Sequence, residues 1–424
     1  MKAILRLRHW ILGIVSANHP LISPKAYQSV MFSLERYGDP APLLTALSRG
    51  AADASVLIFF VLSGVVIGLN EDGEFKKPSL IGYLERRAVR IMPIYVIAVV
   101  AGAMAAGQLV SGKWLGSLIF LQTWLAPSPA GNGPLWSLHY EVAFYLMFPL
   151  ISLIRANWSL VLLICLAAIP LSLTGNHLAI VLTYFSLWVI GFLISRRIEP
   201  GQFPSLPLQP IALLLLMVAF LLANPFGPVI AKIALPVRFA ENLPHPAMAV
   251  IAGIGIATAV ASTVGVGRRL LIWVFWVNAF FIAGALLFAA TKHLLAMPTY
   301  EGGATLLVLA LVVFCVGRGR AIGADQAAAT GSLSYALYAL HTPLLSAYMT
   351  FSASWQALTF FAGLPIILAL TFTLSWLIEM KLQPRIRALA KVHLRYFREH
   401  PDEIIGTRLT QSNGLLAPGI GLER

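Results

Sequence analysis

Charged residues are scarce in this chain, and acidic residues are the scarcest. Only 11% of its 424 residues are charged, with 17 acidic against 30 basic side chains, and 58% are hydrophobic. A soluble domain carries roughly twice that charged fraction, so the composition argues against a water-soluble protein. The repeated apolar runs predict an all-α, polytopic transmembrane helix bundle of about 10–12 spans.

Cysteine is also rare, and the signatures of common cofactor sites are missing. The two cysteines, Cys165 and Cys315, both lie in apolar runs, which argues against a disulfide or a zinc site. We find no Walker motif, no Rossmann fingerprint and no internal repeat. No small-residue cleavage site follows the first apolar run, so we expect no cleavable signal peptide. The sequence therefore predicts no metal and no tightly bound cofactor.

Basic residues account for the net charge of +13 and indicate how the chain crosses the membrane. They gather at the ends of apolar runs, as the positive-inside rule requires, which argues against a nucleic-acid partner. With the N-terminus placed in the cytoplasm, 23 of the 30 basic residues fall on the cytoplasmic side. We therefore expect both termini in the cytoplasm and the basic tail near membrane lipid.

The apolar runs suggest a membrane domain over residues 1–380, followed by a basic cytoplasmic tail over 381–424. The first part of that tail, Pro384 to Phe397, could form a basic amphipathic helix on anionic lipid. Residues 114–128 are apolar too, and we interpret them as an interfacial or re-entrant piece. The candidate spans lie near residues 4–22, 52–70, 91–109, 135–154, 159–174, 178–195, 210–224, 246–264, 271–290, 303–317, 333–352 and 357–379.

One apolar, aromatic-rich segment carries polar groups that a membrane span ordinarily lacks. Ser137, His139 and Glu141 lie within five positions of one another there. An ionisable group inside a membrane span is costly, and it usually faces the interior of the bundle. Glu141 therefore marks a candidate functional site inside the membrane.

Five local patterns, in this order along the chain, resemble the acyltransferase-3 family of integral membrane acyltransferases. The resemblance covers residues from about 6 to 380. Any one of the patterns would be weak by itself, and their order makes the match strong. The patterns are Arg8 with His19 eleven positions later, Phe59 to Gly64, Arg87 and Arg90 with Pro93 and Tyr95, Trp136 to Pro149, and Ser334 to Pro343.

The resemblance implies an enzyme of the bacterial inner membrane that transfers an acyl group. In that family the donor is typically an acyl-CoA, often acetyl-CoA, used as a substrate. The acceptor is a sugar hydroxyl on a surface glycan or glycolipid. Two other functions stay open: a transporter of a sugar or lipid-linked substrate, although no inverted repeat is visible, and a non-catalytic relative that binds a glycan or lipid.

His19 is the candidate general base. Eleven helical residues rise about 16 Å, so His19 lies near mid-membrane if Arg8 sits at the cytoplasmic interface. Glu141 enters from the outer side and His341 from the inner side, so the three could converge at similar depth. A histidine suits proton abstraction from a hydroxyl, and Glu141 could orient its imidazole. Alternatively, His19 is an interfacial residue before the helix-ending Pro20, and Glu141 only anchors its own helix.

Arg87 and Arg90 are candidates for binding the donor. They are three positions apart and so share a helix face, and their planar guanidinium groups match the geometry of the CoA phosphates. The alternative is that they only mark the cytoplasmic end of a span, which is the interpretation we favour for Arg86. Arg8 has the same two interpretations.

The remaining polar and aromatic residues carry weaker predictions. Ser63 and Gly64 predict close helix packing, with Ser63 a secondary candidate for lining the substrate site. We assign Trp136 and Tyr145 to packing, keeping Trp136 as a lining candidate, and Ser137 to a helix cap. His139 should point away from Glu141. His341 either lines the site or binds only a backbone carbonyl.

Overall fold

The described part of the chain is a bundle of helices. The computed structural model describes residues 41–71, 77–112, 114–122, 124, 131–198, 205–224, 245–263, 265, 267–291, 297–323, 334–351 and 357–390. Within these ranges the long elements are all helices. Two short strands, β1 (Ser205–Pro207) before α10 and β2 (Ala321–Gly323) after α14, pair antiparallel. The prediction of an all-α fold is therefore confirmed.

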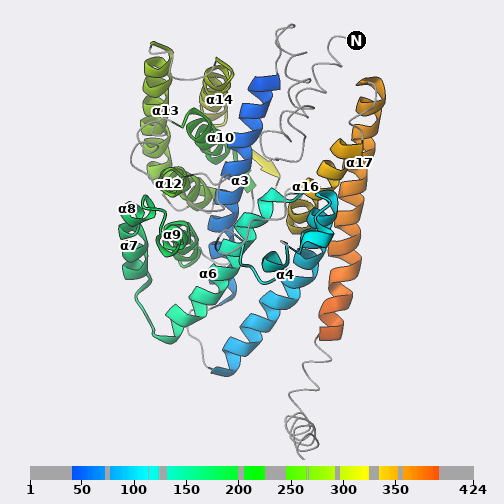
Figure 1. Cartoon of the computed structure of the whole chain (residues 1–424). Helices are drawn as coiled ribbons and strands as arrows, with labels where there is room; N and C mark the ends of the chain where they lie inside the picture. The colour runs from blue at the N-terminus through cyan, green and yellow to red at the C-terminus, as the bar shows by residue number, and fades with distance from the viewer. Residues whose placement is uncertain are drawn as a thin grey trace, which may run out of the picture.

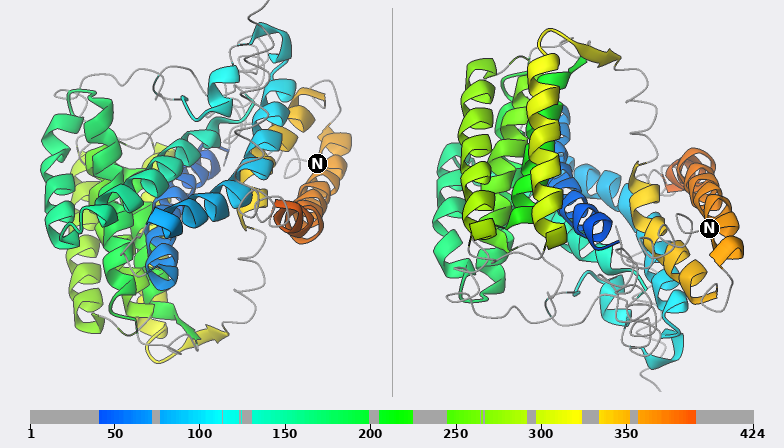
Figure 2. Two further views of the ribbon diagram at one scale, coloured as in Figure 1. Left: turned by 90° about the horizontal axis from the view of Figure 1, so that it is seen from below. Right: turned by 90° about the horizontal axis from the view of Figure 1, so that it is seen from above.

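The helices fall into two groups on either side of α3 (Figures 1 and 2). Helices α7 to α14 pack together on one side, and α4, α16 and α17 lie on the other. Helix α6 touches both groups, because it contacts α4 and α9. The bounds are α3 Ala41–Asn70, α4 Lys77–Ala105, α5 Leu115–Leu118, α6 Trp136–Leu153, α7 Trp158–Ala167, α8 Ile169–Ser172, α9 His177–Ser195, α10 Leu208–Ala223, α12 Pro246–Thr263, α13 Arg268–Thr291, α14 Met297–Val316, α16 Ser334–Phe351 and α17 Ala357–Leu377.

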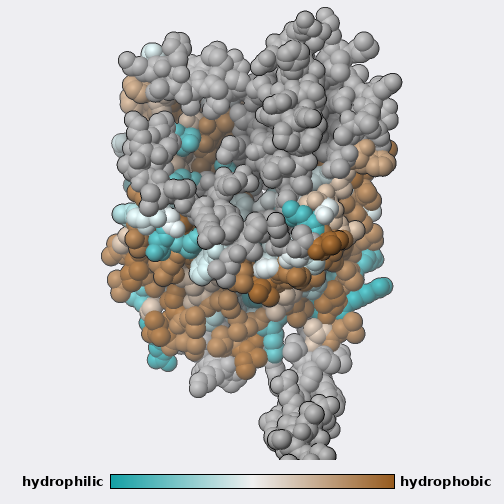
Figure 3. All heavy atoms as spheres, in the orientation of Figure 1, coloured by the Kyte–Doolittle hydropathy of each residue, from teal (hydrophilic) through white to brown (hydrophobic). Residues whose placement is uncertain are grey.

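Six of the described helices are long and apolar enough to cross a membrane, and three shorter apolar helices accompany them. Large apolar side chains on their outer faces are exposed, for example Phe280 at 85% and Trp273 at 72%. The visible surface of the described residues is correspondingly apolar over a broad area (Figure 3). These features suit a lipid environment, and they support the prediction of a polytopic membrane protein. The six long helices lie over residues 53–70, 80–105, 177–195, 246–263, 268–288 and 365–390.

Three predicted boundaries differ from the structure. Helix α4 begins at Lys77 rather than near residue 91, so Arg87 and Arg90 lie well inside a helix and not at its start. The span expected over 159–174 is divided into α7 and α8 just before Pro170. The span expected to end at residue 379 continues from α17 through a π turn and further helix to residue 390, while the division into a membrane domain and a tail at residue 380 stays a prediction. Residues 391–424 lie outside the described part.

Helices α3 and α9 approach each other until their backbones touch, and glycine makes this possible. A Cβ atom added to Gly64 would lie 2.0 Å from the carbonyl oxygen of Trp188. A Cβ atom on Gly191 would lie 2.0 Å from the carbonyl oxygen of Val61, so each helix uses a glycine against the other. Gly68, four positions after Gly64, faces a side chain instead: a Cβ atom there would lie 1.9 Å from the Oγ atom of Ser195. The prediction of close packing at Gly64 is confirmed.

Helix α16 contains a proline whose missing N–H is compensated by a side chain from a distant segment. Pro343 cannot donate to the carbonyl of Ala339, four residues earlier. The Nδ2 atom of Asn132 lies 2.9 Å from that carbonyl oxygen and 3.2 Å from the carbonyl oxygen of Ala98. Asn132 is fully buried, so one amide joins α16 to α4 inside the protein. Buried backbone groups need such partners because an unpaired one is costly.

The glycine contact gives a first prediction. Gly64→Leu should prevent correct packing of α3 on α9, because the new side chain meets backbone atoms that cannot move aside. Gly284→Leu is a matched control on a lipid-facing helix, since nothing lies within 4 Å of the position of its Cβ atom. Thermal unfolding of the detergent-purified proteins should show a large loss only for Gly64→Leu. Equal melting temperatures for the two variants would contradict the packing argument.

Candidate active site

Glu141 is at the end of a chain of hydroxyl groups inside the protein. Glu141 is 4% exposed, and Tyr145, one helical turn later on α6, donates its phenol hydrogen to the Oε1 atom. The Oγ atom of Ser63 on α3 lies 3.0 Å from the phenol oxygen of Tyr145. Since Tyr145 uses its hydrogen on Glu141, Ser63 donates to Tyr145. Ser63, a secondary candidate for lining the substrate site, is thus connected to Glu141 through Tyr145.

Arg87 covers this chain of hydroxyls from α4. Its guanidinium carbon lies 5.6 Å from the centre of the Tyr145 ring and 5.3 Å from that of Tyr83. This is the range of cation–π attraction, which is stronger away from water. The Arg87 side chain is 13% exposed, and its buried Nε atom has no hydrogen-bond partner within the described ranges of the chain. Arg87 therefore lies over the ring of Tyr145, and its Nε–H group is available to donate a hydrogen bond.

An acidic residue directly after α3 pairs with two arginines of α4. Glu71 lies 2.7 Å from Arg86 and 3.9 Å from Arg87, measured from its Oε1 atom to an Nη2 atom of each. The side chain of Arg86 is 58% exposed, so its ion pair belongs to the surface, in agreement with the structural role favoured for it. The sequence did not predict the role of Glu71, because no pattern around this residue indicates that its carboxylate pairs with arginines of α4.

Arg90 joins the same electrostatic group. Its guanidinium lies close enough to Glu141 to stabilise the carboxylate, and Arg87 does the same. Arg90 also lies within electrostatic range of Glu379, in the π turn after α17. The structure therefore brings the two predicted arginines to the predicted carboxylate.

Tyr338 of α16 contacts the segment that begins α6. The Tyr338 hydroxyl donates to the carbonyl of Pro134 at 2.9 Å and lies 2.7 Å from the Oγ atom of Ser137. Ser137 itself donates to the Pro134 carbonyl at 3.1 Å. The prediction that Ser137 caps a helix is therefore wrong: its hydroxyl binds an acceptor at the start of α6, not a free N–H.

The two histidines of these segments both bind backbone carbonyls. His341 donates from Nδ1 to the carbonyls of Tyr338 and Leu337, at 2.8 and 3.1 Å. Its Nε2 atom then accepts from the hydroxyl of Thr342 at 3.0 Å. His139 donates to the carbonyl of Phe120, so it points away from Glu141 as predicted. No contact between His341 and Glu141 occurs in the described part of the chain, which favours the second interpretation of His341.

Aromatic packing surrounds the polar group. Trp136 is 9% exposed, and its ring lies 6.4 Å from that of Phe60, 5.8 Å from Tyr140 and 6.0 Å from Tyr184. Packing is therefore the role that these contacts support for Trp136. The assignment of Tyr145 to packing is incomplete, because its hydroxyl binds the carboxylate. The Glu141–Tyr145 spacing of four was the available signal for this pair.

Arg8 and His19 lie outside the described residues, so their predicted roles stay predictions. The described carboxylate is suited to such a partner. Among the residues that the structure describes, the buried Oε2 atom of Glu141 has no hydrogen-bond partner, while Oε1 accepts from Tyr145. A buried carboxylate oxygen without a partner is costly, so this atom is available to a histidine or a substrate hydroxyl.

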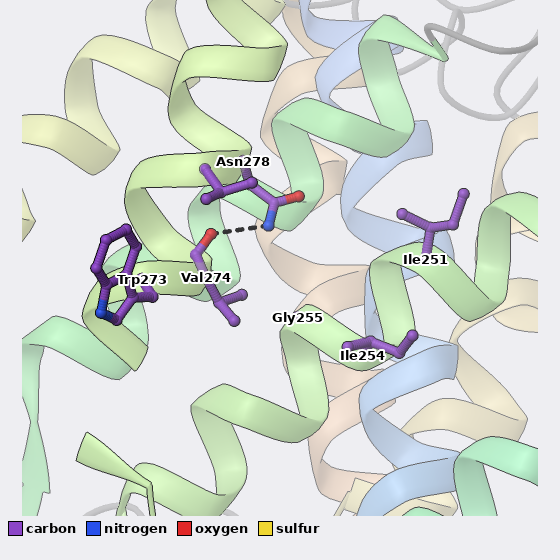
Figure 4. Close-up of a pocket in the computed structure, with 7 residues that line it drawn as sticks. Ile251, Ile254, Gly255, Trp273, Val274 and Asn278 are labelled. Atoms are coloured by element: carbon purple, nitrogen blue, oxygen red, sulfur yellow. Dashed lines mark hydrogen bonds between the residues drawn. The ribbon is translucent and has the colours of Figure 1, made fainter. Parts of the chain in front are cut away.

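A separate cavity of about 260 Å³ opens between α12 and α13 (Figure 4). The amide of Asn278 donates to the Val274 carbonyl of its own helix at 2.8 Å. The lining contains no ionisable side chain, so it offers none of the groups that acid–base chemistry requires. The cavity is lined by Ile251, Ile254, Gly255, Trp273, Val274, Val277 and Asn278.

Comparisons with known proteins show the family of the chain. Residues 9–380 match the profile of the acyltransferase-3 family, described as an acyltransferase domain. Acyltransferase MdmB of Streptomyces mycarofaciens is 38% identical over 136 residues, which make up 29% of this chain and 33% of that protein. The match thus spans about a third of the length of that relative. No solved structure matches the chain. Because the family profile covers nearly the whole sequence, the chain belongs to the acyltransferase-3 family.

Proposed function

We propose that this membrane acyltransferase moves an acyl group, acetyl in the first instance, from cytoplasmic acyl-CoA to a hydroxyl of a glycan or glycolipid. One observation carries the proposal. A buried carboxylate oxygen without a partner, on Glu141, lies in the same polar group as a buried guanidinium with a free donor, on Arg87. At one site, the carboxylate can support the group that accepts a proton, and the guanidinium can bind the anionic acyl donor.

The arginines supply the binding site for the donor. CoA carries a pyrophosphate and a ribose phosphate, and a guanidinium fork binds two phosphate oxygens at once. Arg87 interacts with Glu71 through one Nη atom at 3.9 Å, a weak hold that a phosphate can replace. Arg90 is exposed, so it can reach the same ligand from the next turn of α4.

The acid–base group lies deeper. In the transfer, the acceptor oxygen attacks the thioester carbonyl, the new C–O bond forms, and the C–S bond breaks to release the CoA thiol. His19 takes the proton from the attacking hydroxyl, and Glu141 holds the charged imidazole. Tyr145 and Ser63 fix the carboxylate through the hydrogen bonds described above. The deprotonated thiolate of CoA then takes up that proton directly or through water.

The decisive experiment measures the chemistry directly. Detergent-purified protein should release free thiol from acetyl-CoA when a glycan or glycolipid acceptor is present, and mass spectrometry should find the acceptor heavier by one acetyl group. Thiol release without an acceptor would indicate hydrolysis. Transport of an intact sugar into vesicles without thiol release would support the transporter instead.

The general base gives a prediction in the N-terminal span. His19→Ala should reduce acyl transfer by about 10²–10⁴-fold, because that is the usual contribution of a general base. Initial rates of thiol release check this. The variant should elute from size-exclusion chromatography as the wild type does. More than about a tenth of wild-type activity would remove His19 from proton transfer.

The arginine assignment is tested by donor affinity. Arg87→Ala should raise the KM for acetyl-CoA about tenfold or more and leave the KM for the acceptor unchanged. Arg87→Lys should restore binding only in part, because lysine lacks the fork. The donor KM of the wild type should rise more steeply with salt than that of Arg87→Ala. Unchanged donor KM values would leave Arg87 with a topological role.

The hydroxyl chain gives a prediction that separates charge from packing. Glu141→Gln keeps the size of the side chain but removes its charge, so activity should fall by about 10²-fold or more. Tyr145→Phe keeps the ring beneath Arg87 and removes the hydrogen bonds of its hydroxyl with Glu141 and Ser63 but leaves the carboxylate, so its loss of activity should be smaller, about tenfold. Rates of thiol release, with melting temperatures as a folding control, check both. A Glu141→Gln enzyme with wild-type activity would assign Glu141 to anchoring its helix.

A further inference from the structure

Gln383 binds the helix turn that carries the two arginines. Its Nε2 atom lies 3.0 Å from the carbonyl oxygen of Val89 and 2.7 Å from that of Arg90. Gln383 is 1% exposed, although Leu382 and Arg385 beside it are exposed. This side chain therefore lies against α4, some 290 positions away in the sequence.

The carbonyl of Val89 needs this partner because of Pro93. In a helix, the N–H of residue 93 would donate to the carbonyl of residue 89, and proline has no N–H. A freed carbonyl in an apolar environment is costly, and water is not at hand inside a membrane. Asn132 solves the same problem at Pro343 in α16. The side-chain amides of Gln383 and Asn132 thus each replace a backbone hydrogen bond that a proline removes from a helix beside the candidate site.

A π turn directs Gln383 toward α4. Residues Ile378–Leu382 form this turn immediately before Gln383. An i→i+5 turn accommodates one residue more than an α turn, so it changes the face on which the following residues lie. Single π turns are rare and are frequent at functional sites. Helices α4 and α17 both pack on α16, and Gln383 adds a direct bond between them.

We propose that Gln383 is a positioning residue for donor binding. It holds the opened turn of α4 so that Arg87 stays above Tyr145 and Arg90 stays within reach of Glu141. Gln383 does not touch the substrate. Its role rests on the proposed function of Arg87 and Arg90, but the bond to the Val89 carbonyl is a property of the protein without any ligand.

A double-mutant cycle tests this role on the purified full-length protein. Gln383→Met keeps the volume and removes both amide donors. Pro93→Ala returns an N–H to position 93, so the Val89 carbonyl regains a donor in its own helix. Thr373→Val is the control on the same helix, because its exposed hydroxyl binds only the carbonyl of Ala369. Hydrogen exchange of residues 86–96 and the KM values for acetyl-CoA and acceptor are measured for each variant.

Gln383→Met should speed hydrogen exchange of residues 86–96 and raise the KM for acetyl-CoA at least fivefold, with the acceptor KM unchanged. In the Pro93→Ala background, the same substitution should change both quantities less than twofold. Thr373→Val should match the wild type. If Gln383→Met alone fails to fold but the double variant is recovered, the carbonyl is the reason and the proposal stands.

Two results would overturn the proposal. Unchanged hydrogen exchange in Gln383→Met would show that Gln383 does not hold the turn. Faster exchange with an unchanged donor KM would show that the turn does not govern donor binding. A wild-type protein that releases no thiol from acetyl-CoA would instead contradict the proposed function, and the exchange measurements would then decide on the bond to Val89 alone.

Discussion

The scarcity of water inside a membrane governs this structure. Each buried polar group must find a partner within the protein, because an unpaired one is costly in an apolar surrounding. The proline-opened carbonyls of Val89 and Ala339 are bound by Gln383 and Asn132. The Glu141 carboxylate is bound by Tyr145 and supported by two arginines. The buried atoms of the described residues that still lack a hydrogen-bond partner include Oε2 of Glu141 and Nε of Arg87, and these two belong to the proposed site.

The close contact of α3 and α9 positions these groups. Gly64 and Gly191 let the two backbones touch, which fixes α3 against the larger bundle. Ser63 is the residue before Gly64. The contact of α3 with α9 at Gly64 therefore also positions the Ser63 hydroxyl beside Tyr145 on α6. Helix packing and the polar chain are thus set by adjacent residues of one helix. A change in the helix contact would displace the active site with it.

The polar group is built where the two groups of helices meet, from α3, α4 and α6. Ser63 comes from α3, Glu141 and Tyr145 from α6, and Arg87 from α4. This arrangement places the two arginines and the buried carboxylate in one electrostatic group. The π turn and Gln383 connect the last described helix to the same group.

The sequence by itself determined the class of fold and singled out several residues of the candidate site. Low charge and repeated apolar runs sufficed for a membrane bundle, because a lipid environment permits few alternatives. Glu141, Arg87 and Arg90 stood out because charge within an apolar segment is costly. The start of α4, by contrast, was misplaced, since charged residues hid a helix that the tertiary contacts stabilise.

Only the tertiary structure decided which groups meet. Local spacing places Glu141 and Tyr145 on one helix face, but it does not show that Ser63 lies beside them. Glu71 reaches α4 from the connection just before it and Gln383 reaches it from a distant segment, and no periodicity of their own segments encodes that partner. Such pairs depend on how helices pack in three dimensions, whereas a sequence pattern reports only the face of a single helix.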